Sequence, residues 1–284
     1  MLTTTYEMLQ KAYEGHYAVP AINTQGGTYD IIRAVCMAAE ELRSPVILAH
    51  YVNTGAYSGH DWFMRRRNGW PARYLCRLQS IWTTGTALSA GMEMLKLGFT
   101  SIMFDGSALP VEENAAATEA VARVCRSFGV PLEAEIGELC RLDDRGNKIG
   151  ASNIADPDVV RQYLKLCHPD SLAIGIGNAH GFYNGPVDIR VEVLEECRKF
   201  TDIPFVLHGC TGMDEELVKR SIDSGVAKIN FGTQVRCQYV NYLKEGLAEG
   251  KDQGHAWKLS QYAELRLRED IKDIIRLAGS KEKA

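Results

Sequence analysis

The chain has 284 residues, of which 45% are hydrophobic and 24% charged, the proportions of an ordinary globular protein. A formal net charge of −4 provides no electrostatic footprint for nucleic acid, and no run reaches the roughly 18 apolar residues that span a membrane. The N-terminal segment lacks the pattern of a signal peptide and the eight cysteines are scattered, so we expect reduced thiols, a cytoplasmic location, and neither a nucleic-acid nor a membrane partner.

Short apolar runs alternate along the chain with longer segments of helical period. The apolar runs are nearly continuous, which is typical of parallel strands that are covered on both faces. Two more helical segments follow the last run, "TQVRCQYVNYLKEGLAEG" and "SQYAELRLREDIKDIIRLAG". The predicted strands cover residues 17–23, 45–51, 78–84, 101–107, 131–137, 171–177, 204–210 and 227–233.

Eight strand-helix units predict an α/β protein whose residues 1–284 form a single (β/α)₈ TIM barrel domain with an additional C-terminal helix. A doubly wound open sheet is the alternative. It is disfavoured because no Gly-x-Gly-x-x-Gly motif follows the first predicted strand.

Polar residues gather where the predicted strands end. Active sites of such barrels are built at the carboxyl ends of the strands, so these side chains should meet at one mouth. Two imidazoles and one carboxylate with an open fourth position form a common catalytic zinc site. Each histidine could instead be a hydrogen-bonded structural residue. The residues concerned are Asn23, His50, Asp105, Glu135, His180, His208 and Asn230.

Glycine, threonine and asparagine follow the strands in the second half of the chain, in "AHGFYNG", "LHGCTG" and "INFGT". Exposed backbone N–H groups and hydroxyls at these positions suit an anionic phosphate. Phosphate sites after the seventh and eighth strands are frequent in this fold. Ordinary loop glycines are the alternative interpretation.

Seven segments together resemble the class II, metal-dependent ketose-bisphosphate aldolases, and among them the fructose- and tagatose-bisphosphate aldolases most. They are "YAVPAIN", "SPVILA", "GFTSIMFDGSALPVEEN", "LEAEIGEL", "AIGIGNAHGFY", "VLHGCTG" and "KINFGT". The resemblance implies a (β/α)₈ barrel, a homodimer or homotetramer, and a zinc ion. It also implies cleavage of a ketose bisphosphate into dihydroxyacetone phosphate and an aldehyde phosphate.

The same resemblance assigns roles to individual residues. It places His180 and His208 on zinc ligands, and Glu135 on a carboxylate that holds the metal in some of its positions. Asp105 falls on an acidic residue near the metal. The positions predicted to bind the sugar phosphate are Asn23, Gly181, Gly209, Thr211, Asn230 and Thr233.

The chain departs from the family where the chemistry is done. "IWTTG" falls on the family's His-Leu-Asp-His-Gly, so Thr83 replaces the proton-donating Asp and Thr84 replaces a zinc-binding His. In the family's mobile loop, Asp143 stands where a Glu moves the substrate proton, and we predict Asp143 as the catalytic residue. Asn184 stands where many members have Lys. His50 could supply the missing metal ligand.

These departures keep three functions open. The first is aldol cleavage of a ketose phosphate through a metal-stabilised enediolate, weak or redirected because Thr83 cannot act as an acid near neutral pH. The second is a sugar-phosphate isomerase or epimerase that uses the same enediolate. The third is a non-catalytic relative that binds a sugar phosphate. Zinc or another divalent metal is expected in the first two, bound weakly where an imidazole is missing.

Overall fold

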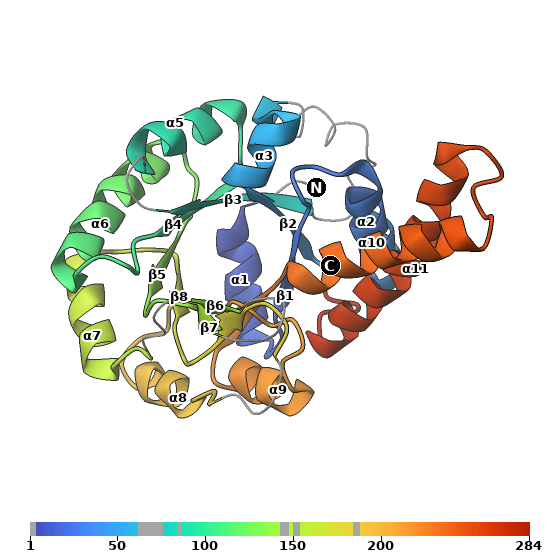
Figure 1. The fold of residues 1–284 in the computed structure, drawn as a ribbon. Coiled ribbons are helices and arrows are strands. Elements are labelled where there is room, and N and C mark those ends of the chain that lie inside the picture. The colour runs from blue at the N-terminus through green and yellow to red at the C-terminus, as the bar shows by residue number, and fades with distance from the viewer. Residues whose placement is uncertain (1–3, 62–75, 84–86, 143–147, 150–153, 184–187) are drawn as a thin grey trace.

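A closed parallel barrel of eight strands forms the centre of the molecule (Figure 1), as the sequence predicts. The computed structural model describes residues 4–61, 76–83, 87–142, 148–149, 154–183 and 188–284. The order of strands around the barrel is β1-β11-β10-β8-β5-β4-β3-β2. The barrel strands are β1 (Val19–Asn23), β2 (Val46–Tyr51), β3 (Cys76–Thr83), β4 (Ser101–Asp105), β5 (Leu132–Ile136), β8 (Ser171–Ile174), β10 (Phe205–Leu207) and β11 (Val226–Phe231).

Several strands end earlier than the sequence predicts. The seventh was expected over residues 204–210, but β10 stops at Leu207, and His208 and Gly209 already belong to the following loop. At this end of the barrel the chain leaves the hydrogen-bonded ladder to form loops, which frees polar residues for a site.

The helices pack around the outside of the barrel (Figure 1). Two of them begin at aspartates whose carboxylates accept hydrogen bonds from the first turn, Asp156 in front of α7 and Asp214 in front of α9. The surrounding helices are α2 (Tyr29–Leu42), α3 (Val52–Ser58), α5 (Ala87–Leu97), α6 (Val111–Ser127), α7 (Pro157–Leu166), α8 (Glu192–Arg198), α9 (Glu215–Asp223) and α10 (Thr233–Ala248).

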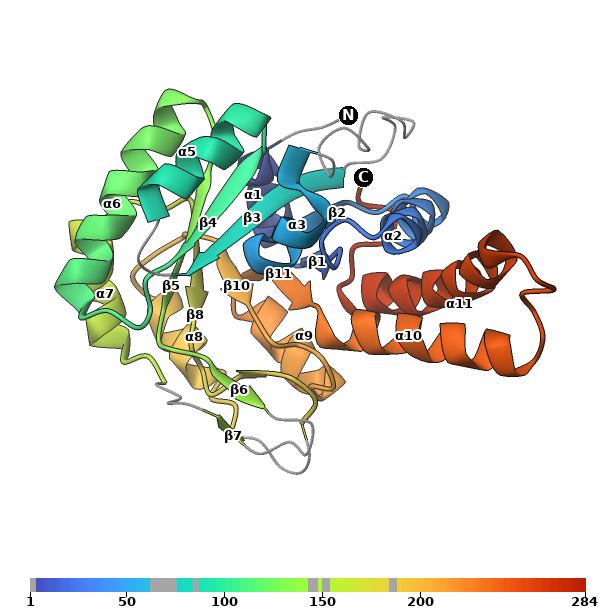
Figure 2. The ribbon, with the colours of Figure 1, turned by 45° about the horizontal axis from the view of Figure 1, so that its top comes forward.

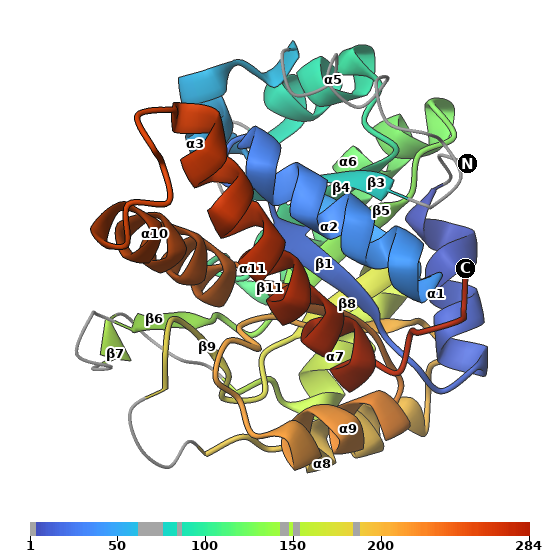
Figure 3. The same ribbon diagram turned by 90° about the vertical axis from the view of Figure 1, so that its right-hand side faces the viewer.

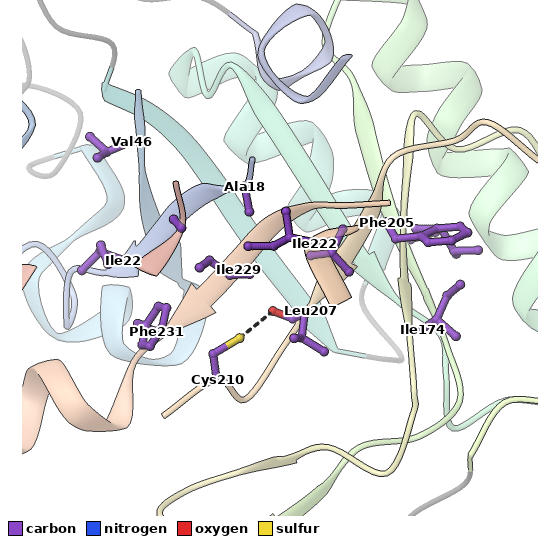
Figure 4. Close-up of a cluster of buried hydrophobic side chains, with 14 of the residues drawn as sticks. Ala18, Ile22, Val46, Ile174, Phe205, Leu207, Cys210, Ile222, Ile229 and Phe231 are labelled. Carbon is purple, nitrogen blue, oxygen red and sulfur yellow. Dashed lines mark hydrogen bonds between the residues drawn. The ribbon is translucent and has the colours of Figure 1, made fainter. Parts of the chain in front are cut away.

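The largest buried cluster fills the space between strands and helices (Figure 4), where Ile22, Val46, Ile174 and Phe205 turn outward from their strands. Successive side chains of a strand point to opposite faces. The neighbouring positions therefore point into the barrel, and this alternation decides which polar side chains can reach its mouth.

The N-terminal end of the barrel is closed by a helix that the sequence analysis did not anticipate, α1 (Thr5–Glu14). Met8, Leu9 and Ala12 of α1 pack on Val19 and Ile47. The opposite end remains for a site.

The additional C-terminal helix predicted from the sequence is α11 (Ala256–Leu277), which lies beside α2 and α10 (Figure 3). Arg268 of α11 donates to Glu41 of α2 at 3.0 Å, and this charged pair joins α11 to the helices around the barrel. Within α11, Arg268 also donates to Glu264 at 2.6 Å. None of the helices in the described part of the chain combines the length and apolar character needed to cross a membrane.

A second, three-stranded sheet lies apart from the barrel wall (Figure 2). Its order is β7-β6-β9, and the sequence analysis did not predict it. The strands are β6 (Cys140–Leu142), β7 (Lys148–Ile149) and β9 (Ala179–His180).

Candidate active site

A cavity of about 590 Å³ opens at the carboxyl ends of the barrel strands. Every described residue that the sequence predicts for metal or substrate binding lines it. Asp143, the predicted catalytic residue, lies outside the described residues, as do Thr84 and Asn184. The predicted residues in the lining are Asn23, Glu135, His180, Gly181, His208, Gly209, Thr211, Asn230 and Thr233.

The imidazole of His208 lies between two carboxylates of β5. Its Nε2 is 3.2 Å from Oε1 of Glu133, and its Nδ1 is 3.5 Å from Oε2 of Glu135. Both glutamates turn inward because they are two residues apart on one strand. His208 is therefore held in one orientation at the floor of the cavity.

Glu133 has a second partner below the cavity. The Nζ of Lys228, on β11, is 2.8 Å from each oxygen of this carboxylate. Burial by itself raises the pKa of Glu133, but the charge of Lys228 and the hydrogen bond to His208 outweigh it and lower the pKa to about 2. The negative charge of Glu133 is thus compensated within the protein.

The pKa of Glu135 is shifted in the opposite direction from that of Glu133. Burial, followed by the charges of Asp105 and Glu133, raises its pKa well above the ordinary value. Negative groups therefore outweigh positive ones around Glu135, and a cation in the cavity would relieve this imbalance.

His180, on β9, also lines the cavity, and its ring centroid is 6.0 Å from that of His208. Strand β9 pairs with β6 so that Arg141 is opposite His180. Strand β6 therefore runs beside this histidine.

The donor groups around the cavity bear on the metal that the family resemblance implies. Two imidazoles and one carboxylate are the donor types of catalytic zinc sites, and the carboxylate here, Glu135, has more negative than positive groups around it. Within the described ranges, no three His, Cys, Asp or Glu side chains are already close enough to hold an ion between them. The donor chemistry fits a divalent cation, and His180, His208 and Glu135 are the residues that would hold it.

The loop after β10 has a backbone that only glycine allows. Gly209 has φ +66°, and a Cβ there would lie 2.2 Å from the carbonyl oxygen of Ala179. The hydroxyl of Tyr183 accepts from the N–H of Ala179 at 2.9 Å and lies 2.8 Å from the carbonyl oxygen of Gly209. The loops that carry His180 and His208 are thereby tied together.

Hydroxyl groups and a helix start lie beside this loop. The buried hydroxyl of Thr211 accepts from the N–H of Gln234 at 3.2 Å, in the first turn of α10, whose first residue is Thr233. Arg236, one turn further along α10, also lines the cavity. Backbone N–H groups, hydroxyls and a guanidinium in one region suit an anionic group.

Asn230 presents an acceptor to the same cavity. Its Oδ1 is buried and has no hydrogen-bond partner within the part of the chain that the structure describes. The side-chain oxygen of Asn23, by contrast, accepts from the N–H and the amide of Gln25. A hydroxyl of a bound ligand would satisfy Asn230, since buried polar atoms rarely lack a partner.

His50 does not reach the mouth, so the idea that it supplies a metal ligand is not supported. On β2, Ala49 and Tyr51 line the cavity, and His50 points to the opposite face. Its Nε2 is 2.8 Å from Nδ1 of His60, and its ring packs beside Phe99.

The residues of this region that the sequence did not point to include Glu133, Lys228, Tyr51 and Arg236. A signal existed for the first two, because Glu133 precedes Glu135 by two residues and Lys228 precedes Asn230 by two. Residues at that spacing share the inner face of a strand.

Comparisons with known proteins agree with the barrel fold. The family described as fructose-bisphosphate aldolase class-II matches residues 3–283. The chain is similar to the YdjI aldolase from Escherichia coli K12, with 26% identity, full coverage of both chains and a TM-score of 0.85. It also shares its fold with a fructose-bisphosphate aldolase from Campylobacter jejuni, with 20% identity, coverage of 99% of this chain and 95% of that one, and a TM-score of 0.80.

Proposed function

This chain belongs to the class II fructose-bisphosphate aldolase family, and we propose that it binds a ketose phosphate at the barrel mouth and acts on it through an enediolate. The observation that carries the proposal is the meeting of two kinds of group in one cavity. His180, His208 and Glu135 form one group, and the loop residues Gly209 and Thr211 belong to the other.

The first group would hold a divalent metal ion, zinc in this family. When bound, such an ion supplies a Lewis acid that polarises the ketose carbonyl and favours the enediolate. The chain's own contribution there is to fix the donors. His208 is held between Glu133 and Glu135, and the negative surroundings of Glu135 favour a cation.

The second group would bind the phosphate. Gly181, Gly209, Thr211 and Thr233 offer N–H groups and hydroxyls, and Arg236 adds a positive charge. Asn230 would then accept a hydrogen bond from a hydroxyl of the sugar through its unpaired Oδ1. Together these contacts orient the carbonyl of the substrate toward the histidines.

The chain departs from its family in the residues expected to transfer protons. Asp143 is proposed to move the substrate proton, and Thr83 replaces the family's acid at the end of β3. Since general acid catalysis contributes about 10²–10⁴-fold, carbon–carbon cleavage should be weak or redirected. This replacement favours an isomerase or epimerase as the second candidate, because those reactions need the enediolate but not that acid. A non-catalytic sugar-phosphate-binding relative is the third.

One set of assays separates these candidates. Release of dihydroxyacetone phosphate from a panel of ketose phosphates reports cleavage, and exchange of substrate hydrogen with deuterated water reports the enediolate alone. Metal analysis of the purified protein accompanies both. Exchange without release supports the isomerase or epimerase. Thermal stabilisation by a ketose phosphate without either activity supports the binding protein, and no stabilisation by any ketose phosphate rejects all three.

We also propose a homodimer or homotetramer. Helices α10 and α11 project from the barrel side by side (Figures 2 and 3), and they expose large apolar side chains that a second copy could cover. Analytical ultracentrifugation tests this. The side chains are Val240, Leu247, Trp257 and Leu265.

A cytoplasmic location is proposed as well. Cys36, Cys125, Cys167, Cys197, Cys210 and Cys237 are free thiols, and four of these six are buried. Free thiols are typical of a reducing compartment. Localisation of the tagged protein in cells tests this proposal.

A further inference from the structure

Four ionisable side chains form a continuous line from the interior of the barrel to the cavity. Lys228 contacts Glu133, Glu133 contacts His208, and His208 faces Glu135. The side chains of Lys228, Glu133 and His208 are 0%, 2% and 3% exposed. Neither Lys228 nor Glu133 lines the cavity, so neither can touch a substrate.

This arrangement determines which nitrogen of His208 carries its hydrogen. A neutral imidazole has one N–H donor and one lone pair, whereas an ionised carboxylate can only accept. Because Glu133 approaches Nε2 at 3.2 Å, the hydrogen belongs on Nε2. The lone pair then lies on Nδ1, the nitrogen that faces Glu135.

The backbone of His208 is fixed by contacts that do not involve its ring. The side-chain amide of Asn178 donates to the backbone carbonyl of His208 at 2.8 Å, and the N–H of Ile176 holds Asn178 in turn at 2.9 Å. The backbone of His208 is thus anchored independently of its ring. The ring itself is oriented from below by Glu133.

Glu133 can orient the ring only while it is itself held. Lys228 contacts both of its oxygens at 2.8 Å. Without the ammonium group, the buried carboxylate would lose its compensating charge and two hydrogen bonds, and it would rearrange. That change would let Glu133 release Nε2 of His208.

We propose that Lys228 is a positioning residue which, by holding Glu133, selects the Nε2–H tautomer of His208 and keeps Nδ1 free to bind the metal. The role of Nδ1 toward the metal rests on the proposed function, whereas the selection of the tautomer does not. Loss of a residue that orients a metal ligand through a hydrogen bond typically lowers metal affinity by about 10- to 100-fold.

The buried pair of Lys228 and Glu133 could instead serve only to stabilise the fold. Two variants separate this structural role from the positioning of His208. Lys228→Met leaves Glu133 without its compensating positive charge. Lys228→Met combined with Glu133→Gln removes both charges, so it should recover much of the lost stability. The amide that Glu133→Gln introduces can either accept from Nε2 of His208 or donate to it, so the double variant should not restore a single tautomer. A structural role predicts that tautomer and metal affinity recover together with stability.

The first measurement is ¹⁵N NMR of the histidine rings in metal-free protein, with His208→Asn used to assign the signal among the seven histidines. We expect the Nε2–H tautomer in the unmodified protein and a mixed signal in both Lys228 variants. Arg268→Met, which breaks another largely buried ion pair outside the cavity, is the matched control and should leave the signal unchanged.

The second measurement is zinc affinity by competition with a chelator. We expect about a 10- to 100-fold loss in both Lys228 variants and none in Arg268→Met. Recovery of the single tautomer and of zinc affinity in the double variant would overturn the proposal, as would the Nδ1–H tautomer in the unmodified protein. If the unmodified protein shows the Nε2–H tautomer but binds no zinc, the proposed metal site is wrong and the positioning role toward metal falls with it.

Discussion

The side-chain amide of Asn114, on α6, donates a hydrogen bond of 2.9 Å to the backbone carbonyl of Glu135 at the end of β5. Asn114 is itself held by Thr118, which donates to its Oδ1 at 3.2 Å. The fit is close, since a Cβ at Gly106 would lie 2.2 Å from the same Oδ1. A helix of the outer layer thus fixes the backbone of a residue that lines the cavity.

Replacing Asn114 by Ala should therefore affect both stability and ligand binding. The carbonyl of Glu135 would be left buried without a partner, which costs about 1–3 kcal/mol of unfolding free energy. Urea denaturation measures this loss, and thermal stabilisation by dihydroxyacetone phosphate measures binding. Thr118→Ala keeps the bond from Asn114 to Glu135 and should lower stability alone. Equal loss of ligand stabilisation in both variants would contradict this role.

Arg236 should contribute to phosphate binding without contributing to stability. It is exposed and lines the cavity beside Thr233. Arg236→Gln should weaken binding of dihydroxyacetone phosphate by about 1.5–3 kcal/mol, the range for a hydrogen bond to a charged group, with an unchanged melting temperature. Isothermal titration calorimetry is the measurement. Arg276→Gln, on the exposed face of α11, is the control that should bind normally.

Fructose-bisphosphate cleavage by the unmodified protein should be very weak, because Thr83 cannot donate the proton that the family's Asp supplies and Thr84 is not a usual zinc ligand. If the site is a damaged aldolase, Thr83→Asp with Thr84→His should raise zinc content and raise cleavage by about 10²–10⁴-fold. If the site is rebuilt for another reaction, the double variant should change little. Efficient cleavage by the unmodified protein would refute the expectation.

His50 should make stability depend on pH. Burial, and then the neighbouring His60, lower its pKa from 6.5 to about 4. The unfolded chain therefore binds the proton at higher pH than the folded protein. The contribution of His50 is fully present above pH 6.5 and is lost as the pH falls to about 4, with a total of roughly 3 kcal/mol.

Urea denaturation across that pH range tests this effect. His50→Gln removes the ionisation and should flatten the dependence by up to about 1.4 kcal/mol per pH unit. His16→Asn is the matched control, because His16 is exposed and its φ of +50° suits asparagine. Parallel pH curves for His50→Gln and the unmodified protein would show that His50 is not the responsible group.

The sequence by itself determined the features that depend on neighbouring residues. The eight strands follow from local apolar runs, and the placement of Glu135, His208 and Asn230 at the mouth follows from their position at strand ends. These assignments need only the strand period and the rule that parallel barrels build sites at one end.

Only the tertiary structure decided which side chains meet. His50 also ends a strand, but one step in the alternation turns it toward Phe99 instead of the cavity. Glu133 and Lys228 are 95 residues apart, and they pair because closure of the barrel brings their inward faces together. Pairing across a closed barrel depends on the stagger and order of all its strands. That information belongs to the whole chain, and no local segment contains it.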